Sequence, residues 1–124
     1  MVDGCVESMT FMRGRPLFLP FLLWLAASLV ACGGALAEGR SQFDKGSYPE
    51  AKQTFASAEA ESRSWSDAKR AEYALYRGLT LGALGDQAHA GVWLREAKAI
   101  EDAHPGSLDA PEAQRLHLGL ESSQ

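Results

Sequence analysis

The 124-residue sequence predicts an all-α domain that follows an N-terminal targeting segment. Three observations support this prediction. From residue 38 onward, the sequence has no alternation of branched apolar and polar residues of the kind that indicates a β-strand. Pairs that contain glycine or proline divide this part into segments of helical length. Residues also recur at a spacing of 39, which is typical of a helical repeat array.

The beginning of the chain has the features of a signal peptide. Residues 12–15, Met-Arg-Gly-Arg, supply positive charge, and an apolar run over residues 16–31 follows. Upstream of them, Asp3 and Glu7 do not fit the positive start of such a peptide. We therefore expect translation to start at Met12 or, as the alternative, at Met9.

Leu29-Val30-Ala31-Cys32 ends the apolar run, and it resembles the lipobox of bacterial lipoproteins. In that family the cysteine thiol receives a diacylglyceryl group, and the signal peptide is cut before the cysteine. The resemblance implies a signal peptide over residues 1–31, lipidation of Cys32 and a short linker over residues 32–37. Two alternatives stay open: cleavage after Ala37, and an uncleaved membrane anchor.

The targeting segment also predicts where the protein resides. Arginines before the apolar run place the following domain outside the cytoplasm. The position after Cys32 is occupied by Gly33 and not by an aspartate. In this respect the segment resembles that of proteobacterial lipoproteins sent to the outer membrane. We expect a lipid-anchored domain that faces the periplasm. Cleavage after Ala37 would instead give a soluble periplasmic or secreted protein.

The domain over residues 38–124 is expected to contain about five helices, as two hairpins and a C-terminal capping helix. Gly46-Ser47 and Gly85-Asp86 each end one helix and begin another, and Pro105-Gly106 ends a third. Ser66 is expected to cap the first helix of the second hairpin. Asp109-Ala-Pro-Glu112 has the capping pattern that begins the last helix.

Apolar residues at helical spacing predict the buried sides of two of these helices. In the helix after Ser66 they are Ala68, Ala71, Leu75, Leu79 and Gly82. In the last helix they are Ala113, Leu116 and Leu120.

The two predicted hairpins align when the chain is shifted by 39 residues. The matching pairs are Gly39 with Gly78, Gly46 with Gly85, Ala51 with Ala90, Phe55 with Leu94, and Ala58 with Ala97. Small residues in both helices would let the two helices approach closely. The pattern resembles the tetratricopeptide repeat, although that family's period is about 34. The extra residues lie near positions 61–65, where we expect a longer connection or longer helices.

The resemblance to tetratricopeptide repeats implies a groove lined by the first helix of each hairpin, where a protein partner binds. The positions that map to this groove are Arg40, Phe43, Asp44, Glu72, Leu75 and Leu79. Half of them are apolar, which suits an extended or helical protein segment. The aromatic residues Trp65, Tyr73, Tyr76 and Trp93 are expected to pack between helices or to contribute to recognition.

Several other function classes lack support in the sequence. From residue 38 onward there are 14 acidic and 10 basic residues, so no concentrated basic face is available for nucleic acid. Both cysteines precede the domain, and the three histidines have no metal-ligand spacing. No nucleophile motif or phosphate-binding loop is present. We expect no catalytic site, cofactor, metal or small-molecule substrate.

These observations predict a non-catalytic envelope lipoprotein whose helical module binds a protein partner. One alternative is an accessory subunit or regulator of an envelope-assembly or cell-wall enzyme complex, in which other subunits supply the chemistry. The other is the soluble adaptor that cleavage after Ala37 would produce.

Overall fold

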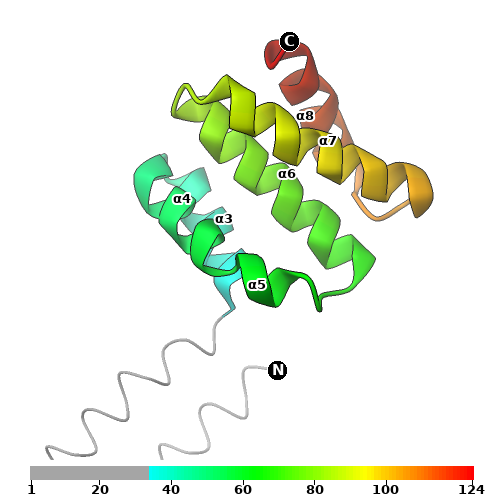
Figure 1. Ribbon diagram of the computed structural model, residues 1–124, viewed down its shortest axis with the longest axis horizontal. Helices are drawn as coiled ribbons and strands as arrows, with labels where there is room; N and C mark the ends of the chain where they lie inside the picture. Colours follow the sequence, from blue (N-terminus) through cyan, green and yellow to red (C-terminus); the bar gives the residue numbers. More distant parts are fainter. Residues whose placement is uncertain (1–33) are drawn as a thin grey trace, which may run out of the picture. The chain divides into compact units, whose positions relative to one another are not determined.

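The computed structural model describes residues 34–124, so the predictions about the signal peptide and Cys32 lie outside the described residues. The described part is entirely helical (Figure 1), which confirms the all-α prediction. Its helices are α3 (Ala35–Asp44), α4 (Tyr48–Ser57), α5 (Glu59–Ser62), α6 (Asp67–Ala83), α7 (Gln87–Ala103) and α8 (Ala110–Ser122).

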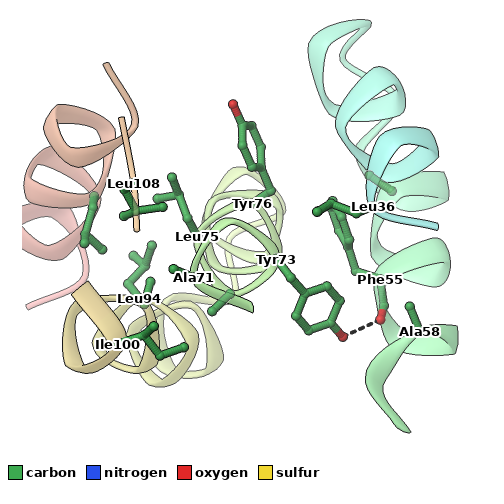
Figure 2. Close-up of a cluster of buried hydrophobic side chains, with 14 residues drawn as sticks. Leu36, Phe55, Ala58, Ala71, Tyr73, Leu75, Tyr76, Leu94, Ile100 and Leu108 are labelled. Carbon is green, nitrogen blue, oxygen red and sulfur yellow. Dashed lines mark hydrogen bonds between the residues drawn. The ribbon is translucent and has the colours of Figure 1, made fainter. Parts of the chain in front are cut away.

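Helices α3 and α4 form the first hairpin, α6 and α7 form the second, and α8 covers the second hairpin. Helix α6 is central, because it contacts α3, α4, α7 and α8. Figure 2 shows α6 end-on, with the first hairpin on one side and α7 and α8 on the other. Two hairpins and a final helix were predicted, and this arrangement is found.

The structure differs from the prediction in one helix, since residues 34–124 form six helices where about five were expected. Helix α4 ends at Ser57, and the chain continues as the single turn α5. At this junction the Ala58 N–H donates to the Phe55 carbonyl, three residues back, at 3.2 Å. That bond tightens the helix and interrupts its regular ladder. Together with the loop before Ser66, α5 accounts for the extra residues of the 39-residue period.

The predicted turns and caps are present. Gly46, Gly85 and Gly106 have φ angles of 76°, 86° and 91°, in the left-handed region that favours glycine. The Ser66 side chain accepts a hydrogen bond from the Lys69 N–H at 3.3 Å. At the start of α8, the Asp109 side chain accepts from the Glu112 N–H at 2.8 Å, and the Glu112 carboxylate accepts from the Asp109 N–H at 3.2 Å.

The two hairpins use their aligned residues in the same way. A Cβ atom on Gly39 would overlap the ring of Phe55, and one on Gly78 would lie 2.7 Å from Leu94 Cγ. Phe55 and Leu94 are 0% and 2% exposed. The aligned alanines Ala51, Ala90, Ala58 and Ala97 are buried as well. The 39-residue period therefore corresponds to a structural repeat of one helical hairpin.

The buried surface of α6 is wider than predicted. Ala71 and Leu75 of the predicted stripe are fully buried, Leu79 and Gly82 are partly buried, and Ala68 is exposed. The additional buried residues of α6 are Tyr73, Ala74, Tyr76, Gly78, Thr80 and Leu81. A single stripe suits a helix that packs on one side, whereas α6 has neighbours on several sides (Figure 2).

The predicted face of α8 is confirmed in its centre. Leu116 is 5% exposed, while Ala113 and Leu120 are partly buried. Gly119 is buried too, and a Cβ there would lie 3.1 Å from Leu94 Cδ1. Helix α8 therefore covers the apolar end of the second hairpin, as predicted.

Candidate interaction surface

One face of the domain is formed by α3, α6 and α8, and we call it the A face. Tyr76 of α6 lies beneath its centre and is 2% exposed. The Arg40 guanidinium of α3 lies 4.8 Å from the centre of the Tyr76 ring. From α8, Arg115 Nη1 donates to the Tyr76 hydroxyl at 3.0 Å. Phe43 packs edge-on against the same ring, with centroids 5.5 Å apart. Tyr76 thus joins three helices that are distant in sequence.

Charged side chains surround Tyr76 on the A face. Arg40 forms an ion pair with Glu72, one turn before Tyr76 on α6. Burial opposes the charge of Arg40, but Glu72 and Tyr76 outweigh it, so the pKa of the guanidinium is raised. Burial also raises the pKa of the Glu72 carboxyl; Arg40 lowers it, and the nearby Glu112 raises it again. The pKa of Glu72 lies above its ordinary value, because its carboxyl group is partly buried and lies close to a second carboxyl group, that of Glu112.

The structure brings together three of the six residues predicted to line a groove: Arg40, Phe43 and Glu72. Asp44 is exposed at the end of α3, and Leu79 is partly buried against α8. Leu75 is 0% exposed, so it belongs to the core and does not line a surface. Its side chain points toward Leu108 and away from the first hairpin (Figure 2).

Sequence reasoning missed the role of α8 in this face. Arg115 and the buried Glu112 were not predicted as site residues, and Tyr76 was singled out only as an aromatic residue. A signal for Tyr76 was available, because Glu72 and Tyr76 are four residues apart and so share one side of a helix. Nothing local in α8 showed that Arg115 would reach α6.

A second feature is a hollow of about 290 Å³ between α5, α6 and α7. It is lined by Glu59, Ser62, Arg63, Arg70, Tyr73, Ala74, Val92, Trp93, Glu96 and Ile100. Tyr73 and Tyr76 leave α6 in different directions (Figure 2), so the hollow and the A face are separate. The hollow lies where α5 and the following loop lengthen the connection between hairpins.

Tyr73 organises the aromatic residues at this hollow. Its ring makes edge-on contacts with Phe55, Trp65 and Trp93, at centroid distances of 5.8, 5.5 and 5.8 Å. Its hydroxyl donates to the Phe55 carbonyl at 2.5 Å. Burial raises the pKa of Tyr73, and the adjacent Arg77 opposes that rise. Packing between helices, one of the two roles expected of these aromatics, is therefore found.

Arg77 completes this cluster. Its Nη1 atom contacts Glu59 at 2.6 Å and donates to the Tyr73 hydroxyl at 2.9 Å. The guanidinium also lies 4.2 Å from the centre of the Trp93 ring. The side chain is 15% exposed, so this cation is largely removed from water. Its contacts join α5, α6 and α7, which suits a structural role.

The histidines of the described part lie beside carboxylates on the surface. His89 Nδ1 is 2.8 Å from Asp86 Oδ2, while His104 and His117 are 3.4 and 3.5 Å from Asp67 and Glu121. The His89 N–H hydrogen bond lowers the pKa of Asp86. Across residues 34–124, no three His, Cys, Asp or Glu side chains are grouped so that they could hold a metal ion.

Two further findings concern classification. None of the helices between residues 34 and 124 is long and apolar enough to cross a membrane. Comparison of the chain with protein-family models, with curated proteins and with solved structures finds no match.

The raised pKa of Glu72 gives a testable pH dependence. The folded protein favours the protonated Glu72 carboxyl, and protonation therefore stabilises the fold. This stabilisation is complete below the ordinary glutamate pKa of about 4.3. It is lost as the pH rises through the raised pKa of Glu72. Glutamine resembles the protonated acid. We expect Glu72→Gln to be at least as stable as the wild type at pH 7 and to vary less in stability between pH 4 and pH 7.

Urea unfolding at several pH values measures this effect. Glu50→Gln is the matched control, because Glu50 is exposed on α4. The control should keep the wild-type pH dependence. A Glu72→Gln protein that is clearly less stable than the wild type at pH 7 would contradict the account, since the ion pair with Arg40 would then outweigh burial and Glu112.

Proposed function

We propose that this protein is a lipid-anchored component of a bacterial cell envelope whose helical module binds another protein without catalysing a reaction. The observation that carries the proposal is the position of the lipobox-like Leu29-Val30-Ala31-Cys32 directly before a helical repeat. Cys32 would carry the acyl chains. Two or more chains give stable membrane attachment, because each buried methylene contributes about 0.8 kcal/mol.

The start of α3 supports cleavage before Cys32 over cleavage after Ala37. Residues 35–37 form the first turn of α3, and Leu36 is 6% exposed within the core. Cleavage after Ala37 would remove Leu36 from the mature protein, at a cost comparable to the roughly 2–5 kcal/mol of a leucine truncation. Cleavage before Cys32 keeps the whole helix. A processing site that preserves the fold is the more favourable of the two.

The A face is the surface that we assign to the protein partner. Its exposed or partly exposed side chains include Phe43, Arg40 and Arg115, and aromatic residues and arginine are enriched in protein interfaces. Arg40 and Arg115 lie on either side of Tyr76, while Glu72 and Glu112 lie among them. The partly exposed Phe43, together with side chains of both charges, suits a protein segment. A tetratricopeptide-like arrangement uses the first helix of each hairpin in the same way.

Lipidation is tested by metabolic labelling with alkyne-tagged palmitate in a Gram-negative host that expresses the full chain. We expect the wild type to incorporate the label and Cys32→Ser to lose it. Cys5→Ser is the matched control and should keep the label, because it changes the only other cysteine. Absence of label from the wild type, or its retention in Cys32→Ser, would refute the anchor.

The partner surface is tested by photo-crosslinking in intact cells. A photoreactive residue at Asp44 or Arg115, on two different helices of the A face, should capture the same protein. Val92 supplies the control, because it lies on α7 and is 54% exposed. Capture from Val92 alone, or of different proteins from Asp44 and Arg115, would contradict the assignment of the partner to the A face.

A further inference from the structure

Helix direction alternates along the domain, so the start of α3 and two of the connections between helices lie at one end of it. This end, which we call the proximal end, contains the start of α3 and the residues 62–67 and 103–110. One contact across it joins the end of α7 to the start of α6, since His104 Nε2 lies 3.4 Å from Asp67 Oδ2. Figure 1 shows the start of α3 near α5.

Chain length limits how far the proximal end can lie from a lipid on Cys32. This step rests on the lipidation proposed above. Only Gly33 and Gly34 separate Cys32 from Ala35, the first residue of α3. Three residue steps span at most about 11 Å, even when fully extended. Acyl chains in the membrane hold Cys32 at the headgroups, so the start of α3 must lie within that distance of them.

The proximal end carries side chains suited to a membrane surface. Trp65 is partly exposed, and Lys69 Nζ lies 4.2 Å from the centre of its ring. Arg63, two residues before Trp65, has a side chain that is 75% exposed. Tryptophan favours the boundary between lipid and water, and lysine and arginine pair with lipid phosphates.

Most carboxylates at this end already have partners within the domain. Glu101 accepts hydrogen bonds from the N–H groups of Gly106 and Leu108, at 2.9 and 2.8 Å. Asp109 caps α8, and Asp102 lies 2.7 Å from Lys98 Nζ.

Asp67 lies 3.4 Å from Arg70 as well as from His104. Glu61 is exposed, and Arg63 lies 3.7 Å from Glu59. The charged side chains around Trp65 are therefore of both signs, and the contact with the membrane rests on the short tether and on the exposed side chains of Arg63 and Lys69 beside Trp65.

We propose that Arg63, Trp65 and Lys69 rest on the phospholipid headgroups of the membrane that holds the lipid anchor. The short tether brings the proximal end to the membrane, and these three side chains contact it there. The domain is then held in one orientation on the membrane, and α3, α6 and α8 all begin at its membrane side.

The two tryptophans after Cys32 allow a direct test. Trp93→Phe leaves Trp65 as the only tryptophan of the mature protein, and Trp65→Phe leaves Trp93, which packs between α6 and α7. The full chain is expressed, and its processed product is purified and weighed by mass spectrometry. It is then reconstituted in phosphatidylethanolamine–phosphatidylglycerol vesicles that contain a headgroup-nitroxide lipid, which quenches nearby fluorescence.

We expect quenching of Trp65 to exceed that of Trp93 at least twofold. Arg63→Glu with Lys69→Glu should remove most of this difference. Lys52→Glu with Arg95→Glu, the same charge reversal at exposed positions on α4 and α7, should preserve it. Circular dichroism confirms that each variant is folded.

Equal quenching of the two tryptophans in a lipidated product would overturn the orientation but not the anchor. A difference that survives Arg63→Glu with Lys69→Glu would overturn the role of these side chains. A product whose mass shows no acyl chains would overturn the proposed function, and this inference with it.

Discussion

In each hairpin a large side chain of the second helix lies directly on a glycine of the first. Phe55 covers Gly39, and Leu94 covers Gly78. These contacts fix how closely the helices approach, because the interior has no space for a further carbon atom. Leu94 also lies against Gly119 of α8, so the same residue positions the final helix. The positions of the side chains on the surface of the domain depend on this spacing between the helices.

Helix α6 contacts α3, α4, α7 and α8, so the spacing between helices also determines where the side chains on its different sides lie. Tyr73 and Tyr76 leave it three residues apart, and each is the centre of a cluster of aromatic and arginine side chains. Around Tyr73 the cluster joins the hairpins and is largely buried, as Arg77 shows. Around Tyr76 it joins α3 and α8 and carries Glu72 and Arg40 toward the surface. The cluster around Tyr73 therefore joins the two hairpins, and the cluster around Tyr76 joins α6 to α3 and α8.

The features that sequence reasoning predicted correctly are local ones. The turns at Gly46 and Gly85, and the caps at Ser66 and Asp109, depend on residues close together in the chain. The repeat was also visible, because its glycine and its large residue recur at the same spacing. These signals were sufficient for the all-α fold and for the order of its hairpins.

The assignment of side chains to surfaces could not be predicted in the same way. Leu75 and Tyr76 are neighbours in sequence and both are buried. Only the angle at which α6 crosses its partners decides that Leu75 packs toward Leu108 and that Tyr76 lies beneath the A face. The end of α4 at Ser57 and the reach of Arg115 to Tyr76 depend likewise on contacts between distant segments. The anchor at Cys32 remains a prediction from sequence.

The contact between Gly78 and Leu94 is tested most directly by the free energy of unfolding of Gly78→Ala, measured with Gly91→Ala as its control. At Gly91, also within a helix, an added Cβ would meet only the mobile end of Arg95, at 3.0 Å. We predict that Gly78→Ala costs about 1–3 kcal/mol through overpacking. Gly91→Ala should be neutral or stabilise the domain by up to about 1 kcal/mol. Equal stability of the two variants would contradict the account.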